Sequence, residues 1–128
     1  MVAARYAYLI LAWVFVVGLV IQVFLIGLGL FSDPGAVELH VTFGYILHLF
    51  PLLIVIAAAV ARAVRRRILQ AVALAAIVFV LPLLPLLRDS VPVLAALHPV
   101  LALLAFGAAM GVAIGATRFT QAGRAVAG

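Results

Sequence analysis

The chain has 128 residues, of which 70% are hydrophobic and 9% are charged, and its mean hydropathy of +1.49 exceeds what a water-soluble domain of this size can bury. The composition therefore excludes a water-soluble protein and predicts one that is covered by bilayer lipid. The formal net charge of +5 comes from arginines at the ends of apolar segments, so we attribute it to membrane topology and expect no nucleic-acid partner.

Four apolar segments predict four membrane-spanning helices, over residues 6–31, 39–61, 68–87 and 94–117. Each segment is long enough to cross about 30 Å of hydrocarbon at about 1.5 Å of rise per residue. Inside lipid, each segment must satisfy its own backbone hydrogen bonds, which favours α-helix. We therefore predict an all-α fold: an integral membrane antiparallel four-helix bundle that forms a single transmembrane domain over residues 1–128.

Turns and bends are expected where proline and polar residues interrupt the apolar segments. The turns fall at residues 31–35, 61–67 and 86–92. Pro82 and Pro85 are expected to bend the third helix, because proline removes a backbone donor from the helix interior. Residues 119–128 are too short to fold alone, and we predict a frayed tail there.

Arginine placement predicts the orientation of the bundle. If the spans alternate, seven arginines fall on one side: Arg5, Arg62, Arg65, Arg66, Arg67, Arg118 and Arg124. The other side has only Arg88, together with the acids Asp33, Glu38 and Asp89. Because arginine-rich loops stay in the cytoplasm, we predict cytoplasmic N- and C-termini for a multi-pass protein of the cell inner (cytoplasmic) membrane.

Two histidines are predicted to lie at the same depth near the outer face. The second and fourth spans run in the same direction, and His40 and His98 each lie near the start of their span. A bis-histidine haem needs two imidazoles from different helices that face each other across one iron, and this pair meets the depth requirement. The alternative is two interfacial histidines that hydrogen-bond to lipid headgroups or to Glu38.

Gly44 and His48 follow His40 on the same helix. Gly44 lies four residues after His40, on nearly the same face, so a macrocycle ligated by His40 would have room there; the alternative is close packing of two helices. His48 lies about 12 Å further along the helix axis than His40, so these two histidines cannot ligate one iron together.

An ionisable residue in mid-membrane calls for a functional hypothesis, and several interpretations of His48 stay open. It could contact the same haem or its propionates, or ligate in place of His40. It could also belong to a proton or substrate path with Gln22, Gln70 and Thr42. The remaining interpretation is a neutral imidazole that hydrogen-bonds to a neighbouring helix. Pro51, just beyond it, is expected to kink the second span.

The fourth span carries Gly107, Gly111 and Gly115 at a spacing of four residues, which is typical of closely packed membrane helices. Such a seam can join two copies of the chain or serve an internal contact. A homo-oligomer is therefore one expected assembly of the chain.

The stretches ELHVTFGYILHLFPLLIVIAA (residues 38–58) and LAALHPVLALLAFGAAMGVAIGATR (residues 94–118) resemble the second and fourth helices of one half of a haem A synthase. The shared pattern comprises His40, Gly44 and Tyr45 in one helix and Leu97 and His98 in the other. In that family each half is a four-helix bundle whose two outer histidines bind a haem. The layout also resembles small uncharacterised bacterial four-helix membrane proteins.

The resemblance implies haem b bound by His40 and His98. The chain departs from the family in two respects. It has one bundle in place of two, and Glu38 precedes His40 by two residues where the catalytic glutamate of the family precedes its histidine by three. Oxidation of a haem methyl group is therefore not implied.

We therefore predict a membrane protein that holds one haem b near the outer face, for electron transfer or haem handling. The iron ligands are His40 and His98, with Gly44 and His48 as further cofactor-binding residues. Two axial histidines leave no open iron position, so a redox or accessory protein is favoured over a stand-alone enzyme. The expected partners are the lipid bilayer and a quinone or a larger redox complex. The alternatives are a cofactor-free structural or accessory subunit and a small transporter.

Overall fold

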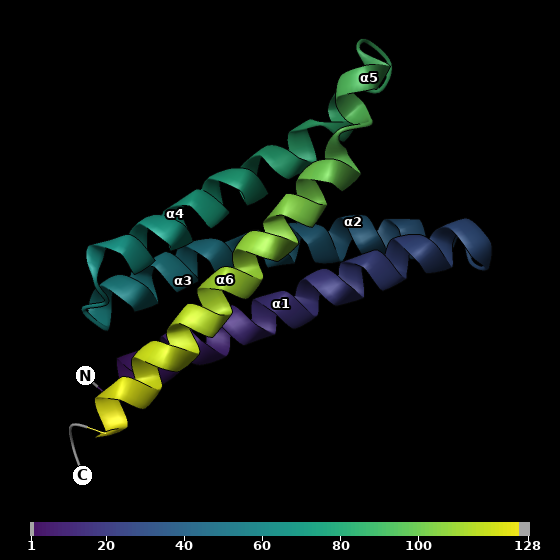
Figure 1. The fold of residues 1–128 in the computed structure, drawn as a ribbon. Coiled ribbons are helices and arrows are strands. Elements are labelled where there is room, and N and C mark those ends of the chain that lie inside the picture. Colours follow the sequence, from purple (N-terminus) through teal and green to yellow (C-terminus); the bar gives the residue numbers. More distant parts are fainter. Residues whose placement is uncertain (1, 126–128) are drawn as a thin grey trace.

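The structure is a computed structural model that describes residues 2–125, and these residues form helices and no strand (Figure 1). The elements are α1 (Val2–Phe31), α2 (Gly35–Leu47), α3 (Leu49–Val60), α4 (Arg65–Val80), the short 3-10 helices η1 (Leu81–Leu83) and η2 (Pro85–Leu87), α5 (Pro92–Ala95) and α6 (His98–Ala125). Four stretches are long and apolar enough to cross a membrane: Val2–Phe31, Gly35–Val60, Arg65–Leu87 and Pro92–Gly123. The predicted all-α fold with four spans is confirmed, whereas the orientation of the termini stays a prediction.

The four long segments pack as a ring. Helix α1 contacts α2, α3 and α6, and α4 contacts α3 and α6. The order around the ring is therefore α1, then α2 with α3, then α4, then α6. In this order α2 and α6 occupy opposite corners, so side chains that point inward from these two helices meet across the bundle interior.

Small residues dominate the interior of the bundle. Ala12, Ala58, Ala71 and Ala113 are almost completely buried, and larger side chains such as Phe15 fill the remaining space. Small residues let membrane helices approach closely and gain van der Waals contact. The outward faces carry large apolar side chains that would contact lipid, which agrees with the composition.

The second span is broken at His48, between α2 and α3. Pro51 has no amide hydrogen, so the carbonyl oxygen of Leu47 loses its donor four residues later in the helix. The break therefore lies at the position where a proline interrupts the hydrogen-bond ladder. The sequence predicts a kink near Pro51, and the structure shows an interruption of the α-helix at His48, three residues before the proline.

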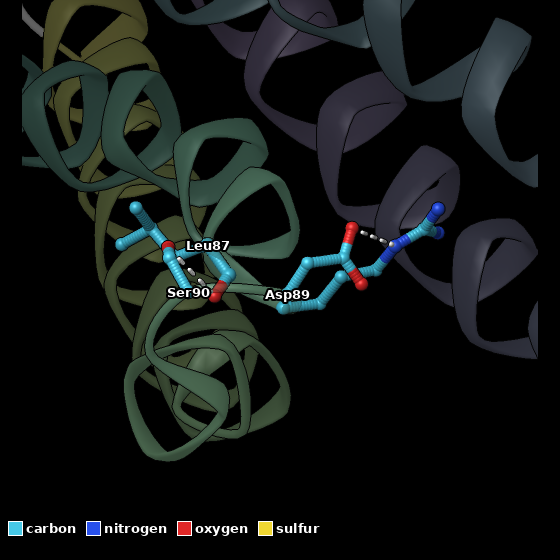
Figure 2. Close-up of polar contacts among 4 residues, drawn as sticks. Leu87, Asp89 and Ser90 are labelled. Carbon is cyan, nitrogen blue, oxygen red and sulfur yellow. Dashed lines mark hydrogen bonds and ion pairs between the residues drawn. The ribbon is translucent and has the colours of Figure 1, made fainter.

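The third span changes from α-helix to two 3-10 turns, η1 and η2, at Leu81. Pro82 is the second residue of η1 and Pro85 is the first residue of η2, where a missing amide hydrogen is tolerated. The sequence predicts a bend at these prolines, and the structure shows that α-helix gives way to 3-10 turns here. Beyond it, Ser90 Oγ donates to the carbonyl oxygen of Leu87 at 3.3 Å, as Figure 2 shows.

The fourth span extends further than predicted, because α6 continues to Ala125. Thr120 Oγ1 donates to the carbonyl oxygens of Ala116 at 2.9 Å and of Arg5 at 3.3 Å, and the guanidinium carbon of Arg5 lies 4.5 Å from the centre of the Phe119 ring. These contacts with α1 hold the last turns of the helix. The predicted fraying from residue 119 is therefore wrong for residues 119–125, and residues 126–128 lie outside the described part of the chain.

Helix α3 ends in a Schellman motif, which begins the connection to α4. The amide of Ala63 donates to the carbonyl oxygen of Ala58 at 3.0 Å, and Arg62 has a φ of 54°. This left-handed conformation is the one that glycine usually supplies after a helix. An L-residue here stores about 1–2 kcal/mol of backbone strain.

Candidate functional site

The structure brings His40 and His98 together. His40 lies in α2, and His98 is the first residue of α6, at the opposite corner of the ring. The centres of the two imidazole rings are 6.5 Å apart, and the ring planes are inclined by 71°. Both side chains are half-buried. The two residues that the sequence pairs as ligands are therefore neighbours in the bundle interior.

Each imidazole is fixed by a hydrogen bond to a backbone carbonyl. Nδ1 of His40 donates to the carbonyl oxygen of Gln22 at 3.0 Å, and Nδ1 of His98 donates to that of Leu81 at 2.9 Å. Because a carbonyl oxygen can only accept, each ring carries a proton on Nδ1. In the neutral ring Nε2 then keeps its lone pair, which is the form that binds a metal ion.

A proline makes the Leu81 carbonyl available. In an unbroken α-helix, the oxygen of Leu81 would accept from the amide of residue 85. Residue 85 is proline and has no amide hydrogen, and the amide of Leu84 reaches the same oxygen only at 3.4 Å. The orientation of the His98 ring therefore follows from the proline-induced change of the third span to 3-10 geometry.

Gln22 contacts α2 at two points. Its carbonyl oxygen accepts the His40 hydrogen bond, and its side-chain amide covers Gly44, where an added Cβ would lie 2.5 Å from Nε2 of Gln22. Oε1 of Gln22 is buried without a hydrogen-bond partner in the described part of the chain. Gly44 thus allows α1 and α2 to approach, and the side chain that occupies the space beside it is the Gln22 amide.

His48 does not join the pair. Its Nδ1 donates to the carbonyl oxygen of Gly44 in its own helix at 2.5 Å, and its ring lies 6.1 Å from Phe79 and 6.4 Å from Tyr45, centre to centre. Nε2 of His48 is buried, and within residues 2–125 it has no hydrogen-bond partner. The imidazole therefore lies between the rings of Tyr45 and Phe79 at the break between α2 and α3.

The arrangement at His40 and His98 suits two ligands of one metal centre. With a metal–nitrogen distance of about 2 Å and a ring centre about 1 Å behind the ligating nitrogen, two imidazoles on opposite sides of a metal ion have centres about 6 Å apart. The observed separation of 6.5 Å agrees with this value. The carbonyl partners of Nδ1 are those that metal-bound histidines usually have.

The histidine pair can be compared with the donor sets that different metal centres need. Among residues 2–125, no group of three or more histidine, cysteine, aspartate or glutamate side chains could hold a metal ion. A structural or catalytic zinc ion needs three or four protein ligands, whereas a haem iron needs at most two because the macrocycle supplies the others. Two histidines are therefore too few for a zinc site of this kind and are as many protein ligands as a haem iron would need.

The remaining predicted residues lie apart from this pair. Glu38 is exposed in the first turn of α2. Gly107 and Gly111 face open space, while Gly115 is covered by the Arg67 guanidinium, so the three glycines do not share one seam. The sequence analysis did not identify the carbonyls of Gln22 and Leu81 as hydrogen-bond partners of the histidines. For Leu81, the proline four residues later is a sign in the sequence that its carbonyl has no helical donor.

Residues 22–86 match the model of a family described as a family of unknown function (DUF6220). The match covers about half of the chain; it includes His40, Gly44, His48 and the Leu81–Pro85 segment, and it ends before His98. No curated protein and no solved structure matches the chain.

Proposed function

The chain belongs to DUF6220, a family of unknown function, and we propose that it is a membrane b-type haem protein that uses His40 and His98 as the two axial ligands. The single observation that carries this proposal is the pair of imidazole rings at 6.5 Å on opposite corners of the bundle. The resemblance to one half of a haem A synthase agrees with it.

In this proposal, the residues of the chain bind and orient. His40 and His98 present Nε2, and the carbonyls of Gln22 and Leu81 hold the proton on Nδ1 of each ring. A bound haem would supply a one-electron couple. A haem held by both histidines would suit electron transfer or haem handling more than substrate chemistry at iron.

An absorption spectrum tests the proposal. The full chain is expressed with haem available and purified in detergent, and the spectrum is recorded before and after dithionite reduction. We expect sharp α and β bands of a six-coordinate b-type haem after reduction. The same spectra are recorded for His40→Ala, His98→Ala and His48→Ala.

The variants separate the possible ligand sets. The proposal requires that His40→Ala and His98→Ala each abolish the six-coordinate spectrum, while His48→Ala retains it. If the six-coordinate spectrum is lost in His48→Ala and retained in His40→Ala, then His48 is a ligand and the proposed ligand pair is wrong. A folded wild-type protein that takes up no haem would favour a cofactor-free accessory subunit.

A further inference from the structure

Two arginines converge on one aromatic ring at the end of the bundle that holds the first turns of α1 and α4. The guanidinium carbon of Arg5 lies 4.5 Å from the centre of the Phe119 ring, and that of Arg67 lies 5.8 Å from it. The two side chains come from α1 and α4, and the ring comes from α6. Three helices therefore build this cluster of Arg5, Arg67 and Phe119.

The bundle makes room for both guanidinium groups. Nη1 of Arg67 donates to the carbonyl oxygen of Gly115, and an added Cβ at Gly115 would lie 2.6 Å from this nitrogen. An added Cβ at Gly123 would likewise collide with the guanidinium of Arg5. The absence of side chains at Gly115 and Gly123 therefore admits both arginines to the helix interface.

The cluster carries positive charge without a counter-charge from an acidic side chain. The three acids of the chain, Asp33, Glu38 and Asp89, lie at the opposite end of the bundle, in or next to the α1–α2 and η2–α5 connections. The first turns of α1 and α4 contain no acidic residue, although the positive ends of their helix dipoles favour one. Two half-buried cations that share one ring repel each other unless an anion lies between or beside them.

One guanidinium atom also lacks an acceptor. Nε of Arg5 is buried, and no hydrogen-bond partner for it exists within the described residues. A buried charged donor that stays unpaired costs free energy, and the bonds that satisfy it are strong when the acceptor is an anion. The Phe119 ring beside the guanidinium offers a cation–π contact and no hydrogen-bond acceptor for Nε.

From this geometry we infer that Arg5 and Arg67 form a binding site for a phosphate group. Guanidinium groups bind phosphate oxygens through paired, charge-assisted hydrogen bonds, and two arginines can hold one phosphate from two sides. At a membrane surface the phosphate can belong to an anionic lipid headgroup or be free inorganic phosphate. The site is separate from the histidine pair and does not rest on the proposed haem.

The test measures stabilisation of the full chain in detergent by three probes: short-chain phosphatidylglycerol, short-chain phosphatidylcholine and inorganic phosphate. The midpoint of thermal unfolding is followed for the wild type, Arg5→Gln, Arg67→Gln and the matched control Arg118→Gln. Arg118 lies on the same helix as Phe119 but is exposed. Each shift is taken relative to the same variant without probe, so a variant that is less stable for other reasons stays informative.

We expect phosphatidylglycerol to bind with saturation and to raise the midpoint of the wild type and of Arg118→Gln. The affinity should fall about tenfold or more in Arg5→Gln and Arg67→Gln, since each loses charge-assisted hydrogen bonds. A matching response to inorganic phosphate would identify the free anion as the ligand, and a response to the lipid alone would identify the headgroup. Equal loss in Arg118→Gln, or no saturable response to either anion, would overturn the inference.

Discussion

Nδ1 of His98 donates to the carbonyl oxygen of Leu81 at 2.9 Å, and Nδ1 of His40 donates to that of Gln22 at 3.0 Å. In both pairs, the histidine lies near the start of its span and the carbonyl lies in the preceding span. The two halves of the bundle therefore orient their histidines in the same way. The Leu81 contact depends on Pro85, which leads to a prediction about a residue that touches neither ring.

Pro85→Ala should weaken haem binding. The new amide at residue 85 can donate to the Leu81 oxygen and compete with His98 Nδ1, so the imidazole loses the bond that holds its proton and orientation. Loss of such a partner typically weakens metal binding about 10- to 100-fold, and haem titration of the apoprotein measures this. Pro82→Ala is the control, because its new amide would reach a carbonyl that no histidine uses. An unchanged haem affinity in Pro85→Ala would show that the proline does not influence the site.

Gly44→Ala should destabilise the bundle by about 1 kcal/mol, because the added methyl group collides with the flexible end of the Gln22 side chain. The free energy of unfolding in mixed detergent micelles, followed by circular dichroism, measures the effect. In a Gln22→Ala background the penalty should disappear. Gly107→Ala is the matched control and should be neutral or slightly stabilising, because nothing lies within 4 Å of its added Cβ.

His48→Leu should keep the haem spectrum and leave stability unchanged or raise it by about 1 kcal/mol. Removing the imidazole also removes a buried nitrogen without a partner among the described residues, and such an atom is costly in an apolar setting. The carbonyl oxygen of Gly44 still accepts from the backbone amide of residue 48 at 3.2 Å. Absorption spectra and unfolding curves check both expectations, with His40→Leu as the variant that should lose the bands.

Arg62→Gly should stabilise the protein by about 1 kcal/mol, because glycine adopts the left-handed backbone at this position without strain. The free energy of unfolding in detergent measures the gain. Arg65→Gly, in the first turn of α4, serves as the comparison and should be neutral or destabilising. A loss of stability in Arg62→Gly would show that its side chain contributes more than its backbone conformation costs.

The positions of the four spans could be predicted because long apolar segments in lipid have few alternatives to helix. The proximity of His40 and His98 followed from one further step, since both lie at the starts of co-directional spans. Pro82, Pro85 and Pro51 marked the interruptions, because the loss of an amide hydrogen acts locally in the chain. These features depend on how far along its span a residue lies and on the missing amide hydrogen of proline, and both can be read from the sequence.

Rotation about each helix axis could not be predicted in the same way. Every face of these helices is apolar, so hydrophobic periodicity does not tell which face points inward. Two interpretations of Gly44 were open, room for a macrocycle and close packing of two helices, and the sequence did not show that the Gln22 amide lies next to it. Gly115 lies against Arg67, while Gly107 and Gly111 face open space. The tail beyond residue 119 was judged by its length, which ignores its contacts with Arg5.

Because each imidazole is oriented by the helical hairpin to which it belongs, the geometry of the two ligands is prepared separately in each half of the chain. A membrane-insertion machinery that releases the chain as two successive hairpins would deliver each histidine with its proton already placed. Docking of the halves would then bring the two rings to their separation of 6.5 Å. A chain nicked at the α3–α4 connection should still form this histidine pair.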